Sequence, residues 1–362
     1  MKKNFYQTVA IATLSVAFTA CEKTNEPDAP VIPYNDGAYI LNSGASSVAN
    51  SSSLSYYDFL SQNISNGVFK AQNDEDPLGD WANHMCIYGS KMYIALSNSG
   101  KIEVTDLNGK RLKKIELKNE QNQPLKPRYI VSHGAYVYFT SYGGTVQRID
   151  TLNMNLDSRK IQVGDFPEAL TVAGNKLFVN NSKYMSNNVN DHGNTVSVID
   201  LTSFSKIKDI DVATNPYNQA LTAADGNVYI VSQENWNGPH TLQRINPENY
   251  EVTRIGDASI IANNGNTLYT YLAIYNGETW FKTYDLKTNT YSDKQFIDVS
   301  KFSFINAMNV NPANGDLYIC DTPSKVKGVV YVLNNKGEEE NSFEVGYSPA
   351  GSFFPTKKFA VK

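Results

Sequence analysis

One pair of sequence motifs recurs seven times and constrains the fold more than any other feature of the chain. Each repeat has a glycine followed by a short apolar run with an aromatic residue, and then an alternating run that ends in Asp or Asn before a turn. The closing residues lie 39 to 50 residues apart and are Asp58, Asp106, Asp150, Asp200, Asn246, Asp285 and Asn334. A period of about 40 to 50 residues with several short strands is typical of propeller blades. We therefore predict an all-β fold, a seven-bladed β-propeller over residues 37–355.

The two ends of the repeat array predict how the ring closes. No inner strand precedes the first glycine, Gly37, whereas the seventh repeat has a surplus segment at residues 347–355. This segment has the same pattern as the inner strands of the other repeats. We predict that it completes blade 1, so that the C-terminal strand closes the ring and removes two exposed sheet edges.

The recurring Asp or Asn allows two interpretations. Seven acidic or amide side chains at equivalent positions could form a ring of ligands. They stand, however, in segments such as Asp106-Leu107-Asn108-Gly109, where an Asp side chain caps backbone N–H groups. We interpret all seven as turn residues.

The N-terminus has the pattern of an export signal. Lys2 and Lys3 precede an apolar stretch at residues 9–18 that is too short to span a bilayer. Phe18-Thr19-Ala20-Cys21 is similar to a bacterial lipoprotein signal, although Phe18 stands where Leu is usual. We predict a signal peptide at 1–20, lipidation of Cys21, a tether at 21–36 and a tail at 356–362. The domain would then be lipid-anchored at the outer membrane, facing the cell surface. The alternative is ordinary secretion, with Cys21 removed or inert.

Composition argues against several functional classes. The formal net charge is −4 and only 19% of the residues are charged, which disfavours nucleic acid as a partner. Cys86 and Cys320 lie in apolar runs and are predicted to be buried free thiols. The four histidines form no metal-binding or catalytic motif. We expect a non-enzymatic protein without a cofactor or a metal.

A candidate binding surface follows from propeller topology. Loops before the inner strands and loops between the second and third strands of each blade meet on one face, around the central channel. In this chain they are rich in aromatic and amide residues, which suit a large, neutral, polar ligand. The predicted ligand-binding residues are Trp81, Asn83, Asn98, Arg128, Tyr142, Phe166, Tyr184, Tyr217, Gln219 and Trp236. The same loops also carry Phe304, Asn306 and Tyr347. The alternative is that many of these aromatic residues only cover the ends of blades.

Several segments resemble a known family. They include GAYILNSG at 37–44, PLGDWANHM at 77–85, NTVSVIDL at 194–201 and SPAGSFF at 348–354. Together with the lipoprotein signal, they resemble the surface propeller lipoproteins of Bacteroides-type bacteria, which are related to YncE-like seven-bladed propellers of the BtuG type.

The resemblance implies a partner and a role. It implies a cell-surface protein that captures cobalamin or a related corrinoid and passes it to an outer-membrane TonB-dependent transporter. A surface glycan-binding or protein-interaction propeller is the alternative. In either case the lipid anchor would be the only contact with the membrane.

Overall fold

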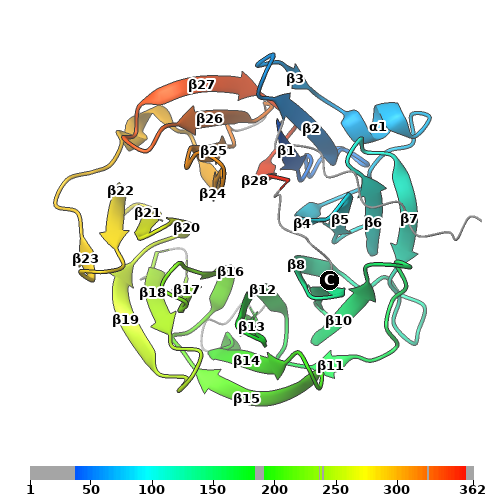
Figure 1. Cartoon of the computed structure of the whole chain (residues 1–362), viewed down its shortest axis with the longest axis horizontal. Helices are drawn as coiled ribbons and strands as arrows, with labels where there is room; N and C mark the ends of the chain where they lie inside the picture. Colours follow the sequence, from blue (N-terminus) through cyan, green and yellow to red (C-terminus); the bar gives the residue numbers. More distant parts are fainter. Residues whose placement is uncertain (1–36, 184–190, 236, 239, 324–325, 356–362) are drawn as a thin grey trace, which may run out of the picture. The chain divides into compact units, whose positions relative to one another are not determined.

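Seven antiparallel sheets form a ring (Figure 1), and a central channel lies between their inner strands. The computed structural model describes residues 37–183, 191–235, 237–238, 240–323 and 326–355. Each sheet has four strands, which follow one another from the channel outward. The predicted seven-bladed β-propeller is therefore confirmed.

The strands of each blade are named from the inside to the outside as A to D. Blade 1 consists of β28 (Pro349–Phe353), β1 (Gly37–Asn42), β2 (Ser53–Asp58) and β3 (Ile64–Ser65). Blade 2 has β4 (Ala82–Tyr88), β5 (Lys91–Leu96), β6 (Lys101–Asp106) and β7 (Arg111–Glu116). Blade 3 has β8 (Pro127–His133), β9 (Tyr136–Ser141), β10 (Thr145–Asp150) and β11 (Ile161–Gln162). Blade 4 has β12 (Pro167–Ala173), β13 (Lys176–Asn181), β14 (Thr195–Asp200) and β15 (Ser205–Asp211).

The remaining blades follow the same order. Blade 5 has β16 (Pro216–Thr222), β17 (Val228–Gln233), β18 (His240–Ile245) and β19 (Val252–Asp257). Blade 6 has β20 (Ile260–Asn264), β21 (Thr267–Ala273), β22 (Thr279–Asp285) and β23 (Thr290–Tyr291). Blade 7 has β24 (Ile305–Val310), β25 (Leu317–Asp321), β26 (Val329–Leu333) and β27 (Glu339–Glu344). A short helix α1 (Val68–Gln72) links blades 1 and 2, and a 3-10 turn η2 (Val299–Lys301) links blades 6 and 7.

The recurring glycine is explained by the turn between strands A and B. Gly89, Gly134, Gly174 and Gly265 have φ angles of 54° to 59° there, and Gly226 and Gly315 have φ angles of 81° and 84°. An L-residue with a Cβ atom is strained in this left-handed region, whereas glycine is not. The repeat therefore marks the tight A–B hairpins of the blades.

The recurring Asp or Asn is a turn residue, as predicted. All seven side chains accept a backbone N–H two to four residues further along the chain. Asp285, for example, accepts from the backbone nitrogens of Lys287 and Thr288, at 2.8 and 2.9 Å. These hydrogen bonds hold the pKa of Asp58, Asp200 and Asp285 below the usual range of a carboxyl group.

The core lies between neighbouring blades, because the apolar B and C strands are covered on both sides. One buried cluster joins Ala38 and Ile40 of blade 1 to Tyr318, Cys320 and Val330 of blade 7. Both described cysteines are free thiols, as predicted, but only Cys320 is fully buried, whereas Cys86 is partly buried. Burial raises the pKa of Cys320 to about 12.

The ring is closed by the C-terminal strand, as predicted. β28 pairs with β1 in the register Tyr39↔Phe353 and Ile40↔Ser352. Blade 7 also holds this strand, because the Oδ1 atom of Asn309 accepts from the backbone nitrogen of Ser352 at 2.9 Å. The two ends of the described ring are thus locked by both main-chain and side-chain hydrogen bonds.

Ending the chain after Gly346 removes β28 and should destabilise the whole ring. The deletion exposes the inner edge of β1 and uncovers the core between blades 7 and 1, so we expect the melting temperature to fall by more than about 10 °C. Circular dichroism during heating measures this. A chain that ends after Pro355 is the matched control and should melt like the parent; a melting temperature within a few degrees of the parent for the shorter chain would contradict the closure.

Candidate ligand-binding site

Two classes of loop meet on one face of the ring, which we call the mouth face. In six blades, one backbone hydrogen bond joins the end of strand B to the segment that precedes strand A of the same blade. The N–H group lies at the end of strand B or just after it, and it donates to the carbonyl of a residue shortly before strand A. Ser97 donates to Trp81 and Gln233 donates to Asn215, each at 2.9 Å, and four further blades repeat the contact. Residues before the inner strands therefore adjoin the B–C loops, as propeller topology predicts.

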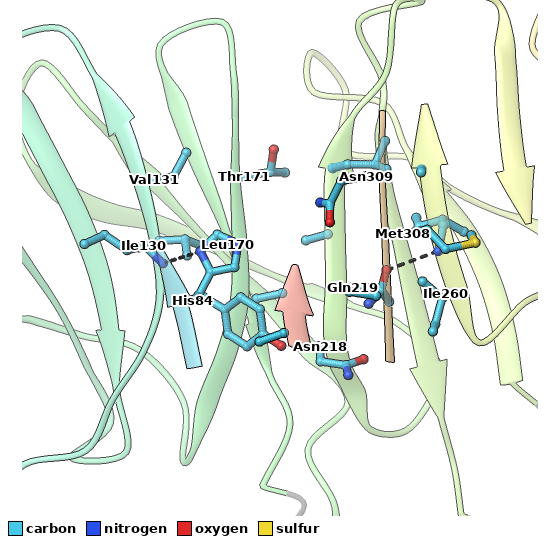
Figure 2. Close-up of a pocket in the computed structure, with 18 of the residues that line it drawn as sticks. His84, Ile130, Val131, Leu170, Thr171, Asn218, Gln219, Ile260, Met308 and Asn309 are labelled. Atoms are coloured by element: carbon cyan, nitrogen blue, oxygen red, sulfur yellow. Dashed lines mark hydrogen bonds between the residues drawn. The ribbon is translucent and has the colours of Figure 1, made fainter. Parts of the chain in front are cut away.

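A cavity of about 710 Å³ occupies the channel beneath the mouth face. The A strands of six blades form most of its wall, and blade 1 adds Ser43 and Ala350 (Figure 2). His84 and Ile130 lie on one side, and Gln219, Met308 and Asn309 lie on the other. The cavity is large enough to accept part of a drug-sized molecule.

Side chains of neighbouring blades cover the inner edges of the A strands. An A strand has a sheet partner only on its outer side, so its other edge presents unpaired backbone groups. The Nδ1 atom of His84 accepts from the backbone nitrogen of Ile130 at 3.4 Å, and the Oε1 atom of Gln219 accepts from that of Ile261 at 3.1 Å. The polar residues of the channel wall thus join the blades to each other.

A buried polar network lies at the mouth between blades 2, 3 and 4. The guanidinium group of Arg128 contacts the carboxylate of Glu168 through Nε and Nη2, each at 3.0 Å. It also donates to the side chain of Asn83, while the hydroxyl of Tyr142 donates to Glu168. Arg128 also lies over the ring of Tyr142, with 4.6 Å between its Cζ atom and the ring centroid.

The electrostatics of this network are those of a closed ion pair. Glu168 is fully buried, and this burial raises the pKa of its carboxyl group, while the neighbouring Arg128 opposes the rise. The attraction of Glu168 raises the pKa of Arg128 in turn. A buried pair of this kind is strongly destabilised when only one partner is removed.

Three exposed aromatic side chains lie on the mouth face. Trp81, Phe304 and Tyr347 are 46%, 55% and 37% exposed, and each lies one or two residues before an inner strand, in blades 2, 7 and 1. Large exposed aromatic side chains on one face commonly mark a binding surface. Trp81 also has a φ angle of 54°, which costs an L-residue roughly 1–2 kcal/mol.

The structure separates the predicted site residues into several groups. Asn83, Arg128 and Tyr142 belong to the buried network, and Phe166 packs edge-on against Tyr142 at 5.2 Å between ring centroids. Tyr217 and Gln219 line the channel below. Trp81 and Asn98 are exposed on the mouth face. Tyr184 and Trp236 lie outside the described residues, as does Cys21.

Sequence reasoning missed the channel residues His84, Asn218 and Asn309. Each is a polar residue in an A strand that is otherwise largely apolar. A side chain of this kind in a strand next to the channel either hydrogen-bonds a neighbouring blade or faces the channel. Such polar positions are visible in the sequence of each strand.

The described residues contain no group of three or more His, Cys, Asp or Glu side chains that could hold a metal ion. In the same part of the chain, none of the helices has both the length and the apolar character needed to cross a membrane.

The comparison with known families is decisive for the family. The chain matches, over residues 36–356, the family described as "Domain of unknown function (DUF5074)". The chain belongs to the DUF5074 family. No functionally curated protein matches this DUF5074 chain in sequence.

Solved structures similar to the DUF5074 chain share its fold. A quinonprotein alcohol dehydrogenase-like protein of Bacteroides thetaiotaomicron has a TM-score of 0.64 and 16% identity, with 89% of this chain and 79% of that chain covered. Hydrazine synthase of Kuenenia stuttgartiensis has a TM-score of 0.59 and 16% identity, covering 79% and 90%. Dihydro-heme d1 dehydrogenase NirN has a TM-score of 0.59 and 10% identity, covering 90% and 77%. Identities this low establish the propeller fold alone.

Replacing Glu168 by Ala should destabilise the DUF5074 chain by about 3–5 kcal/mol, because it leaves the guanidinium of Arg128 buried without its counter-ion. Chemical denaturation measures the change. Asp165→Ala is the matched control: its carboxylate is 66% exposed and lies 3.9 Å from Lys183, so we expect a loss below about 1 kcal/mol. Equal losses in the two variants would show that the network does not hold the mouth together.

Proposed function

We propose that this DUF5074 protein is a non-enzymatic capture protein that binds a large, neutral, polar ligand over the mouth face. The observation that carries the proposal is the side chain of Trp81, a large aromatic group that is 46% exposed at the mouth face. Its left-handed φ is part of the fold, because Phe166, Asn215 and Ser348 have the same conformation directly before their inner strands. The exposed part of the indole gains nothing from folding, and exposed aromatic surface of this kind is commonly used for binding.

The surroundings of Trp81 suit such a ligand. Phe304 and Tyr347 add aromatic surface at the same face, and the cavity beneath offers the amide side chains of Asn218, Gln219 and Asn309. Aromatic faces with a few convergent polar groups are typical of sites for large organic ligands. Arg128 and Glu168 neutralise each other, so this ion pair adds no net charge to the mouth face.

Cobalamin or a related corrinoid is the first candidate ligand. The resemblance to Bacteroides-type surface propellers of the BtuG type supports it, and a propeller of Bacteroides thetaiotaomicron is among the similar structures. A corrinoid is large and carries many amide groups, in keeping with the amide-lined cavity. In this proposal the protein passes its ligand to an outer-membrane TonB-dependent transporter.

A surface glycan is the second candidate, and the exposed aromatic side chains favour it specifically. Trp81, Phe304 and Tyr347 could stack on sugar rings as well as on a corrinoid. A protein partner could use the same face. Since two of the similar structures are named as a synthase and a dehydrogenase, the fold itself does not decide against an enzyme.

We propose in addition that the protein is anchored through a lipid on Cys21. Gly37 pairs with Asp58 at the end of the ring opposite the mouth face, so the chain enters blade 1 from that end. The proposed anchor would precede Gly37 in the chain.

Calorimetric titration of residues 22–362 with cyanocobalamin, cobinamide and a glycan panel tests the function. We expect a corrinoid to bind more tightly than micromolar. Trp81→Ala should weaken that binding roughly thirtyfold, since loss of a central aromatic contact costs about 2 kcal/mol. No heat with either corrinoid would eliminate the first candidate, and heat with a glycan would select the second.

Two further variants separate binding from stability. Trp81→Gly removes the indole together with the strain, so it should bind as weakly as Trp81→Ala and melt at the same or a higher temperature. Leu152→Ala is the control: Leu152 is 79% exposed in the C–D turn of blade 3, on the opposite face, and its loss should change neither quantity. Parent-like binding by both Trp81 variants would mean that the ligand uses another surface.

Cys21→Ser should release the protein from the membrane, because the acyl group would have no thiol to attach to. Fractionation of cells into soluble and membrane parts measures this. Unchanged membrane partitioning of the variant would refute the lipid anchor.

A further inference from the structure

The wall of the central cavity carries no carboxylate, although the protein as a whole is acidic. In the described part of the chain, neither Asp nor Glu lines the cavity, and Arg128 is its one charged lining residue. Glu168 neutralises that charge from behind the wall. The cavity therefore offers a neutral polar lining within a protein of net charge −4.

Two amide side chains in this wall have a fixed orientation. A backbone N–H can only donate, so the side-chain atom that faces it must be an oxygen. Ser352 donates to Oδ1 of Asn309 at 2.9 Å, and Ile261 donates to Oε1 of Gln219 at 3.1 Å. The NH₂ groups of both amides make no other hydrogen bond within the described residues and remain as donors.

Asn83 and His84 are fixed in the same way. The guanidinium of Arg128, which can only donate, faces the side-chain oxygen of Asn83 and leaves its NH₂ group over. The backbone N–H of Ile130 faces Nδ1 of His84, so that nitrogen is unprotonated. Desolvation lowers the pKa of His84 to about 4, so the ring is neutral at pH 7 and its proton is on Nε2. The wall thus has four donor groups from blades 2, 5 and 7.

The wall also has an amide oxygen for a ligand's donor. The NH₂ group of Asn306 donates to the carbonyl of Pro349 at 2.8 Å, so the side-chain oxygen of Asn306 is not used in that contact. Asn306 lines the cavity, and its oxygen can accept from a ligand.

We propose that the central cavity binds a primary carboxamide group of the captured ligand. A carboxamide has one oxygen, which accepts from donors such as those of Asn309 and Gln219. Its NH₂ group donates to the side-chain oxygen of Asn306. The proposal deepens the capture function and rests on it for the source of the group, but the affinity of the cavity for carboxamides can be measured on its own.

The neutral wall favours a carboxamide over a carboxylate or an ammonium group of a ligand. A carboxylate would lose its hydration in a cavity where the one cation is already paired, and this desolvation is expensive. An ammonium group would find no carboxylate and would face four donors. A neutral carboxamide meets neither penalty.

Three small molecules of equal chain length test this in purified protein. Succinamide is neutral at both ends, succinate is anionic and 1,4-diaminobutane is cationic. Saturation-transfer NMR should detect succinamide, with succinate and diaminobutane each at least tenfold weaker. Succinate or diaminobutane binding as tightly as succinamide would overturn the proposal, and so would the absence of succinamide binding.

Two near-isosteric variants place the contact in the cavity. Asn309→Asp and Gln219→Glu keep the oxygen that accepts from the neighbouring strand but replace the free NH₂ donor by a carboxylate oxygen. Each should weaken succinamide binding at least tenfold, and the double variant should gain binding of diaminobutane. Asn246→Asp is the matched control: Asn246 is a turn residue outside the cavity where five other repeats have Asp, and it should bind like the parent. Unchanged succinamide binding in both folded cavity variants would refute the assignment.

The two proposals fail in different experiments. If succinamide binds in the cavity but no corrinoid binds, the carboxamide site stands and the corrinoid candidate fails. If a corrinoid binds the parent, Asn309→Asp and Gln219→Glu equally well, the capture function stands and the carboxamide site fails. Should one cavity variant not fold, as judged by circular dichroism, the other supplies the result.

Discussion

The unpaired inner edges of the seven A strands are the constraint on which the rest of this structure depends. A sheet edge that ends at a channel leaves backbone groups without a sheet partner, and such groups must be satisfied by side chains or water. Here side chains of one blade reach the edge of the next, as His84 does to Ile130 and Asn309 to Ser352. The ring therefore depends on contacts between blades as well as on the pairing within each blade.

These contacts also determine the chemistry of the channel. An amide whose oxygen accepts from a neighbouring strand still has an NH₂ group that can donate in the channel. The hydrogen bonds that join the blades therefore leave more donors than acceptors on the channel wall. At the mouth no such donors are left by the ion pair. There Arg128 pairs with the carboxylate of Glu168, which also accepts from the hydroxyl of Tyr142. The atoms that join the blades are thus different from the atoms of the same side chains that face the channel.

The sequence predicted the fold well because the information was repeated. Seven glycines and seven turn residues reinforced each other, and the absence of a strand before Gly37 pointed to its replacement at residues 347–355. The candidate site was less predictable, because topology identifies the loops of a face but not the partners of each side chain. Arg128 and Tyr142 lie at the predicted face, yet they contact Glu168. The rotation of an A strand about its own axis, which places His84 and Asn309 toward the channel, depends on bulges after the first residues of these strands.

The closure by β28 has a consequence for how the molecule comes into being. On the inner side of β1, Tyr39, near the first described residue, pairs with Phe353, near the last. During synthesis from the N-terminus, blade 1 therefore stays incomplete until β28 has emerged, and pairings of such long sequence separation form slowly. The other six blades can assemble in the order of their synthesis, but the ring closes only when β28 pairs with β1.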